Sequence, residues 1–295
     1  MEPILMKIYE YYSGEGRDML LHAYDFAKEA HANQKRASGE PYFIHPCSVA
    51  EILVDLGLDT ATIAGALLHD VIEDTTYTEE DIRREFGEEV LSLVSGVTKL
   101  DKIVFKSREE EEAENFRKIF VAMAKDIRVI IIKLADRLHN MRSLNYLSKE
   151  RQLKMAQETL DIYAPLAGRL GISQIKCELE DLCLKYLDPE AFEFLVANIH
   201  QKLEQRMRFV DYVVEEINSL LVESKIHGEV FGRPKHFYSI YRKMKNKNCS
   251  LEQIYDLTAV RVIVNSVDEC YEVLGKIHMK WNPMPGRIKD YIAIP

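Results

Sequence analysis

Apolar residues recur at helical spacing through most of the first 226 residues. Between residues 17 and 33 they fall on one side of a helix, with polar residues opposite them, which predicts an amphipathic helix. Capping residues and glycines then mark the ends of further helices. One further helix is predicted to start at Pro46. Others are predicted over 60–74, 78–87, 88–100, 109–124 and 126–141, from Ser148 to Gly168, and over 188–224. None of this stretch shows the sustained alternation of a strand.

The pattern changes after Gly228. Residues 229–231 and 259–264 are short and rich in β-branched or aromatic residues, as strands are. Residues 239–247 and 267–279 are again helical, so the sequence predicts a mixed α/β unit. Two strands alone do not close a stable sheet, and this domain is therefore expected to be incomplete at the end of the chain. The predicted domains are 1–170, a linking helical region 171–226, and a partial domain 227–295.

Length and composition agree with a protein of more than one domain. A chain of 295 residues exceeds the usual size of a single core. Its start lacks the basic and apolar regions of a signal peptide, and no apolar run approaches the ~20 residues needed to span a bilayer. The cysteines are odd in number and form no Cys-x-x-Cys pair, which favours reduced thiols and a cytoplasmic location without a membrane. They are Cys47, Cys177, Cys183, Cys249 and Cys270.

Charge is distributed unevenly along the chain. The formal net charge is −9, yet residues 227–295 carry 11 Lys and Arg against 7 Asp and Glu. The acidic amino-terminal part argues against direct binding to a nucleic-acid backbone. A small polyphosphate remains compatible with it, because a bound divalent ion can be the largest charge in a site.

Candidate chemistry centres on His45, the adjacent pair His69-Asp70, and Asp136. Two imidazoles and two carboxylates mix nitrogen donors with hard oxygen donors, which suits a six-coordinate divalent ion better than a thiolate zinc site does. Such a site can activate water against a phosphate ester. The sequence therefore predicts one divalent metal centre and a hydrolytic reaction.

Each of these residues also has a structural interpretation. A His-Asp dipeptide is weak evidence alone, and Asp136 beside Arg137 is compatible with a structural ion pair. His45 precedes Pro46 and is compatible with a helix-start residue bonded to backbone. The occurrence of all four candidates in one helical domain favours the metal centre.

Two acidic residues follow the His-Asp pair by one helical turn. Glu73 is four residues after His69, and Asp74 is four residues after Asp70. This spacing places both on the same side of a helix. They are candidates for orienting water, donating a proton or binding a second ion, and the alternative is a solvated helix end.

Polar residues before His45 and after Asp136 are candidate substrate contacts. The loop before His45 supplies Lys35, Arg36 and Ser38, and arginine can bind phosphate with two nitrogens or stack on a base. Asn140 and Ser143 follow Asp136 by one to two helical turns and offer further contacts to ribose, base or phosphate.

Four long motifs occur in the helical part of the chain. They are His31-x-x-Gln34-x-Arg36-x-Ser38-Gly-Glu-Pro-Tyr42-x-x-His45-Pro, His69-Asp-Val-Ile-Glu-Asp74, Gly96-Val-Thr-Lys-Leu100 and Lys133-Leu-Ala-Asp-Arg-Leu-His-Asn-Met-Arg142. Together they resemble the hydrolase domain of the Rel/Spo family, the bifunctional enzymes that make and degrade guanosine tetra- and pentaphosphate in the stringent response.

The resemblance implies an HD-type site in which the four candidate ligands hold Mn²⁺. It implies that Glu73 and Asp74 serve the attacking water, and that the loop and the segment after Asp136 contact the nucleotide. Ser143 stands where the family often has Thr, and Ala37 replaces a Lys of some members. The implied reaction is hydrolysis of the 3′-diphosphate of ppGpp or pppGpp, which releases pyrophosphate and GDP or GTP.

The second domain also carries motifs of this family. Gly232-Arg-Pro-Lys-His236, Tyr238-Ser-Ile-Tyr-Arg-Lys-Met244, Tyr255-Asp-Leu257 and Gly286-Arg-Ile-Lys-Asp-Tyr-Ile-Ala293 resemble the start of the synthetase domain. The resemblance implies that Arg233, Lys235 and Lys243 contact the triphosphate of ATP, that Asp256 binds Mg²⁺, and that GDP or GTP binds nearby. A solvated basic face is the alternative for the lysines. Later catalytic residues of the family would lie beyond Pro295, so synthetase activity is expected to be absent.

The predicted fold is thus mainly α: an all-helical HD-type phosphohydrolase domain, a linking helical region, and a partial mixed α/β nucleotidyltransferase-like synthetase domain. Two other functions remain open. One is an HD-type phosphohydrolase acting on a different nucleotide, and the other is a catalytically silent nucleotide-binding regulator.

Overall fold

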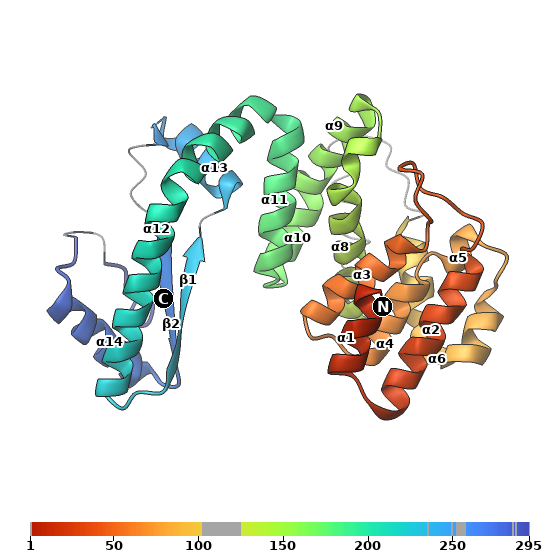
Figure 1. Cartoon of the computed structure of the whole chain (residues 1–295), viewed down its shortest axis with the longest axis horizontal. Coiled ribbons are helices and arrows are strands. Elements are labelled where there is room, and N and C mark those ends of the chain that lie inside the picture. The colour runs from red at the N-terminus through yellow and green to blue at the C-terminus, as the bar shows by residue number, and fades with distance from the viewer. Residues whose placement is uncertain are drawn as a thin grey trace. The chain divides into compact units, whose positions relative to one another are not determined.

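The computed structural model describes residues 2–101, 125–234, 236–248, 250–251, 258–284, 286 and 288–294. The helix expected over 109–124 lies outside these residues, as do Lys235 and Asp256. The described chain forms two compact units, Met1–Leu187 and Asp188–Pro295, which are considered separately (Figure 1).

Helices build the first unit, as their apolar spacing predicts. They are α1 (Pro3–Tyr11), α2 (Gly14–Ala30), α3 (Ile44–Asp55), α4 (Thr60–Leu68), α5 (Val71–Asp74), α6 (Glu79–Asp101), α8 (Ile127–Arg142), α9 (Lys149–Glu158), α10 (Ala164–Arg169) and α11 (Ser173–Leu187). A short 3₁₀ turn, η1 (Leu144–Tyr146), follows α8, and a π-helical turn, η2 (Thr159–Tyr163), joins α9 to α10. A hydrophobic core extends through the described part of this unit.

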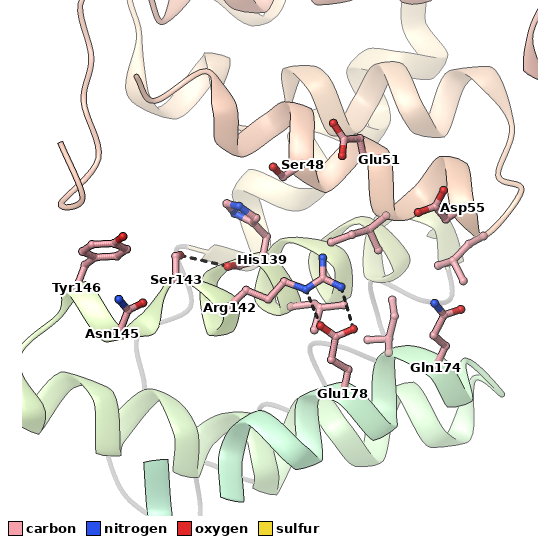
Figure 2. A pocket seen from close by; sticks show the side chains of 14 residues that line it. Ser48, Glu51, Asp55, His139, Arg142, Ser143, Asn145, Tyr146, Gln174 and Glu178 are labelled. Carbon is pink, nitrogen blue, oxygen red and sulfur yellow. Dashed lines mark hydrogen bonds and ion pairs between the residues drawn. The ribbon is translucent and has the colours of Figure 1, made fainter. Parts of the chain in front are cut away.

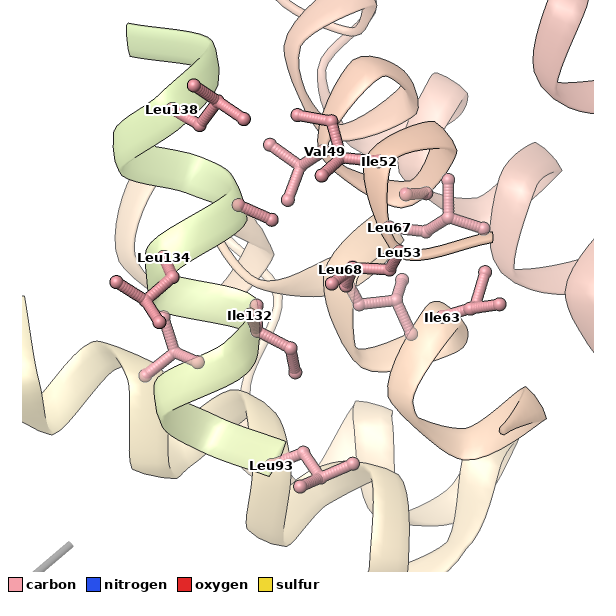
Figure 3. Close-up of a cluster of buried hydrophobic side chains, with 14 of the residues drawn as sticks. Val49, Ile52, Leu53, Ile63, Leu67, Leu68, Leu93, Ile132, Leu134 and Leu138 are labelled. Atoms are coloured by element: carbon pink, nitrogen blue, oxygen red, sulfur yellow. The ribbon is translucent and has the colours of Figure 1, made fainter. Parts of the chain in front are cut away.

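Helix α4 forms the centre of that core. Every residue from Ala61 to Leu68 is buried, and α2, α3, α6 and α8 all pack on the helix. Figure 3 shows leucine and isoleucine side chains of α3, α4, α6 and α8 meeting in the space between them. Gly65 permits this close approach, because a Cβ atom there would lie 3.2 Å from Cβ of Leu93 on α6. The core thus fixes the relative positions of α3, which carries His45, of α4, which ends just before His69, and of α8, which carries Asp136.

The expected continuous helix over 60–74 is wrong at one point. Helix α4 ends at Leu68, His69 and Asp70 form a turn, and α5 begins at Val71. The Nδ1–H group of His69 donates to the carbonyl of Ala66 at 2.7 Å, and so satisfies one of the acceptors left open at the end of α4. The break places the His-Asp pair at a junction instead of within a helix.

The second unit contains a long helix and a small sheet. Its elements are α12 (Pro189–Glu223), β1 (Gly228–Pro234), α13 (Phe237–Lys247), β2 (Thr258–Val264) and α14 (Val267–Lys280). Strands β1 and β2 are antiparallel, with Val230 opposite Val262. Valines on one sheet face pack with Ile217 and Leu221 of α12 and Val273 of α14. The mainly α fold with a small α/β part is confirmed.

The compact units divide the chain differently from the expected domains. Helix α11 packs on α8, α9 and α10 within the first unit, whereas α12 packs on β1 within the second. The region 171–226 is therefore shared between the units, and the boundary lies between Leu187 and Asp188. The functional assignment of the domains stays a prediction.

Candidate metal centre

The four candidate ligands come from α3, from the turn between α4 and α5, and from α8, and they meet in the first unit. His45 lies in the first turn of α3 and is 2% exposed. Its Nε2 atom lies 3.2 Å from Oδ1 of Asp136 on α8 and 3.6 Å from Oδ2 of Asp70. Donor atoms of His45, His69 and Asp70 all lie within 4.8 Å of one another.

His69 supplies the observation that tests the fit of a cation. Because its Nδ1–H group donates to the Ala66 carbonyl, the ring in its neutral form has its lone pair on Nε2. That buried atom has no hydrogen bond, yet Oδ2 of Asp70 lies 3.1 Å away. Two electron-rich atoms facing each other repel unless a proton or a cation lies close to both. The arrangement fits a divalent cation held by imidazole and carboxylate donors.

Both carboxylates also have partners around the cluster. Asp136, which is 4% exposed, accepts from Nζ of Lys133 at 2.6 Å and from Nδ2 of Asn140 at 2.6 Å. Asp70 accepts from the hydroxyl of Tyr42 at 2.7 Å. These bonds offset part of the cost of burying the two charges and fix the direction of each carboxylate.

The pKa values of the cluster show which groups are charged without a metal. Burial acts to lower the pKa of His69, but Asp70 and Asp136 outweigh it and raise this pKa to about 9. For His45, burial outweighs the nearby carboxylates and the pKa is lowered. Burial acts to raise the pKa of Asp70, and His69 nevertheless holds it below its ordinary value. Lys133 is the main group that counteracts burial and lowers the pKa of Asp136. Two ionised carboxylates therefore favour a cation here.

Arg36 lies against the outer side of the cluster. A tight turn with Gly39 at φ +87° and a bridge between Lys35 and Pro41 hold the loop that carries it. Its Nη1 atom lies 2.9 Å from Nδ1 of His139, and its Nη2 atom donates to Oδ1 of Asn140 at 2.7 Å. Burial lowers the pKa of His139 to about 3, with further contributions from nearby cationic groups, so this ring is neutral.

A pocket beside Arg36 brings together four of the five candidate substrate contacts. Its lining consists of Arg36, Ala37, Ser38, Asn140, Ser143, Tyr146, Leu147 and Met155. Lys35 is exposed and does not belong to this lining. The apolar wall of Tyr146, Leu147 and Met155 was not anticipated from the sequence, where these residues have no distinguishing pattern.

A second pocket lies between α3, α8 and α11 (Figure 2). It shares Ser143 and Tyr146 with the first pocket, and His139 forms part of its wall. Arg142 points into it and forms a two-pronged ion pair with Glu178, at 2.6 Å and 2.8 Å. His139 thus lines this second pocket and also contacts His45.

The acidic pair has a more exposed position than the four candidate ligands. Glu73 and Asp74 end the short helix α5, and both side chains are exposed. The side-chain amide of Gln34 donates to the backbone carbonyl of Asp74, and so ties α5 to the loop that carries Arg36. Their roles in handling water and protons stay predictions.

Comparison with family models gives the first part of the chain its classification. Residues 23–173 match the model described as HD domain. The chain belongs to the HD domain family. Residues 232–295 match the model described as a region found in RelA / SpoT proteins. An HD domain followed by this region confirms the resemblance to the Rel/Spo family.

Curated relatives match along nearly the whole chain. A GTP pyrophosphokinase of Myxococcus xanthus is 50% identical over 97% of this chain and 38% of its own length. Guanosine-3′,5′-bis(diphosphate) 3′-pyrophosphohydrolases of Haemophilus influenzae and Aquifex aeolicus are 50% and 47% identical over 91% and 100% of this chain. The chain covers 40% and 42% of these two proteins, so it spans about two fifths of the relatives' length.

The HD domain includes three contact residues that sequence patterns did not single out: Tyr42, Lys133 and His139. All three occur in the quoted motifs, but only the structure shows that Tyr42 contacts Asp70, that Lys133 contacts Asp136 and that His139 contacts His45. The contact of His139 could not be predicted from local sequence because its partner His45 lies 94 residues earlier.

The candidate contacts of the RelA/SpoT region are only partly described. Lys243 lies half-buried on α13. Arg233 lies in β1, and its side chain is outside the described part of the structure, as are Lys235 and Asp256. Their nucleotide and Mg²⁺ roles stay predictions. Among the described residues, no helix combines the length and apolar character that crossing a bilayer requires.

Proposed function

We propose that this chain hydrolyses the 3′-diphosphate of guanosine tetra- and pentaphosphate, with Mn²⁺ as its metal, and releases pyrophosphate with GDP or GTP. The observation that carries the proposal is the meeting of His45, His69, Asp70 and Asp136, in which the buried Nε2 atom of His69 faces Oδ2 of Asp70 at 3.1 Å. The names of relatives at about 50% identity support guanosine alarmones as the substrate class.

The four side chains would hold the ion through two imidazole nitrogens and two carboxylates. A bound divalent ion supplies Lewis acidity, which makes water a better nucleophile and polarises a phosphoryl oxygen. The bonds from Tyr42 to Asp70 and from Lys133 to Asp136 keep the carboxylates in fixed directions. This preorganisation lowers the cost of arranging the site during the reaction.

The neighbouring residues would bind the nucleotide and handle protons. Arg36, Ser38, Asn140 and Ser143 line one pocket beside the centre, and a guanidinium can hold a phosphate with two nitrogens. Lys35 is exposed on the same loop and would add positive charge near the phosphates.

Glu73 and Asp74 would orient the attacking water, and one of them would accept its proton. Their exposed position at the end of α5 leaves them accessible to water and substrate.

The test is pyrophosphate release from ppGpp and pppGpp with and without Mn²⁺. Asp70→Ala should abolish release while the helical circular dichroism is retained, because the variant removes a ligand from a solvent-accessible edge of a buried cluster. Asp18→Ala is the matched control, since Asp18 is an exposed carboxylate of α2 that contacts only Arg17 among the described ion pairs. Full activity of Asp70→Ala would refute the proposed site.

Two other outcomes would replace this proposal. Release of phosphate or pyrophosphate from other nucleotides, but not from ppGpp, would show an HD phosphohydrolase of different specificity. Binding of ppGpp without turnover at any divalent ion tested would show a nucleotide-binding regulator.

A further inference from the structure

His139 is in direct contact with a proposed metal ligand but is not placed to bind the metal itself. Its Nδ1 atom lies 2.7 Å from Nδ1 of His45, on the side of that ring opposite Asp136. The Nη1 atom of Arg36 lies 2.9 Å from the same Nδ1 of His139 and 3.2 Å from Nδ1 of His45. Three nitrogen atoms thus meet at one point behind the metal centre.

The protonation pattern of these nitrogens follows from their chemistry. A guanidinium only donates, so the Nδ1 atom of His139 must be an acceptor and its ring proton must be on Nε2. If Nε2 of His45 faces a cation, the proton of that neutral ring is on Nδ1. The Nδ1–H group of His45 and the Nη1–H group of Arg36 then share one acceptor, His139. The 3.2 Å approach between those two donors follows from this sharing.

Arg36 also contacts the other side of the centre through Asn140. Its Nη2 atom donates to Oδ1 of Asn140, and Nδ2 of Asn140 donates to Oδ1 of Asp136, at 2.7 Å and 2.6 Å. One guanidinium therefore links the outer partners of two proposed ligands that come from α3 and α8.

We propose that His139, held in one tautomer by Arg36, is a positioning residue that orients His45 and raises its affinity for the divalent cation. Partners of this kind fix the ring direction of a metal-binding histidine and make its other nitrogen a better donor. The inference rests on the proposed metal centre, but it concerns residues that touch neither the metal nor, in the case of His139, the nucleotide pocket.

The test is the Mn²⁺ affinity of the whole chain, measured from the electron paramagnetic resonance signal of the free ion. His139→Leu keeps a side chain of moderate size but removes the acceptor, and should weaken Mn²⁺ binding by about 10- to 100-fold. His139→Asn places an acceptor oxygen close to the position of Nδ1 and should restore much of the lost affinity. Circular dichroism checks that both variants remain helical.

Arg142→Met is the matched control for these variants. It removes a guanidinium on the same helix, three residues from His139, that bonds to Glu178 instead of the centre (Figure 2). Its Mn²⁺ affinity should equal that of the unsubstituted chain, even if its unfolding midpoint falls.

A double-mutant cycle tests the connection between Arg36 and His139. Arg36→Met should also weaken Mn²⁺ binding, although Arg36 is not a proposed ligand. Because the two residues act through one contact, the combined Arg36→Met and His139→Leu variant should lose less affinity than the two single losses multiplied together.

The outcomes separate this inference from the proposed function. If the unsubstituted chain binds no Mn²⁺, the proposed centre itself is refuted. If it binds Mn²⁺ and His139→Leu binds equally well, or if His139→Asn loses as much affinity as His139→Leu, only the positioning role is refuted. Independent effects in the double-mutant cycle would refute the role of Arg36 in holding His139.

Discussion

The two compact units differ in what they bury. The first unit buries ionisable side chains inside a continuous hydrophobic core, among them His45, His69, Asp136 and Arg137. In the second unit, the buried residues whose side chains are described are all apolar, and its core cluster is small. Charged groups on the surface of either unit, by contrast, stay in contact with water and do not need to be buried.

The comparison shows where a polar reaction centre can be maintained. Removing a charge from water costs several kcal/mol unless close partners compensate. The first unit provides these partners from helices α3, α8 and the loop before α3, which the packing around α4 holds in place. A small core offers fewer fixed positions for such a network.

The largest expected effect comes from removing the carboxylate partner of a buried arginine in the first unit. Arg137 is 9% exposed, bonds to Glu158 at 3.2 Å and 3.3 Å, and stacks on the ring of Tyr163 at 4.0 Å. Glu158→Leu would leave this guanidinium buried without its carboxylate and should lower the free energy of unfolding by about 3–5 kcal/mol, measured in denaturant.

The double variant Arg137→Met, Glu158→Leu is the decisive comparison for that pair. It removes both charges, so much of the lost stability should return. Equal destabilisation of the single and double variants would contradict the stability cost assigned to the unpaired buried charge of Arg137.

Metal binding should act on the first unit alone. At a free Mn²⁺ concentration of about 100 times the Kd, binding should add about 2.7 kcal/mol to the stability of the unit that holds the ion. Trp281 is the single tryptophan and packs on the core of the second unit, so its fluorescence follows that unit. Mn²⁺ should shift the main helical transition seen by circular dichroism more than the Trp281 transition. An equal shift of both would show that the units unfold together.

The sequence predicted most helices and the residue types of the centre, because both depend on local pattern. Apolar spacing located α2, α3, α8 and α12, and Gly87, with φ +83°, marks the kink in α6 where a helix end was expected. The four candidate ligands were chosen for their donor chemistry, and the structure brings them together.

The sequence could not predict features that depend on contacts between distant residues. The break at His69 occurs where its ring bonds to the carbonyl of Ala66, and helix periodicity gives no sign of it. The position of His139 depends on how α8 packs against α3. The π-helical turn carries Tyr163, whose ring lies against Arg137, a residue that is distant in the sequence.

Replacing a helical glycine by alanine should change stability in opposite directions in the two units. A Cβ atom at Gly96 on α6 would lie 2.7 Å from Cγ2 of Val129, whereas one at Gly275 on α14 would meet no atom within 4 Å. Gly96→Ala should destabilise the first unit by about 1–3 kcal/mol through overpacking. Gly275→Ala should stabilise the second unit by up to about 1 kcal/mol, since alanine favours the helix. Denaturant unfolding followed by circular dichroism and by Trp281 fluorescence separates the two, and a stabilising Gly96→Ala would contradict the tight packing of α6 on α8.

The smallest expected effect on stability comes from replacing the amino-terminal caps of α8 and α14. Asp126 accepts from the backbone N–H of Arg128 at 2.9 Å, and Ser266 accepts from that of Glu269 at 3.2 Å. Replacing either cap by alanine should cost about 1 kcal/mol at neutral pH. The guanidinium of Arg128 lowers the pKa of Asp126 below its ordinary value of 3.8. The folded state therefore binds this proton less tightly than the unfolded state, so the contribution of Asp126 is complete above that value and is lost as the pH falls below it.

The stability effects of the two cap substitutions should consequently differ in acid. The hydroxyl of Ser266 does not ionise, so the difference between the unsubstituted chain and Ser266→Ala should persist near pH 3 or below, whereas the difference for Asp126→Ala should shrink. Asp126→Asn provides the control, because its amide oxygen caps the helix without a titrating charge. A loss for Asp126→Ala that is equally large in acid would mean that the cap acts through its hydrogen bond alone, and that the ion pair with Arg128 adds no stability to the helix carrying Asp136 and His139.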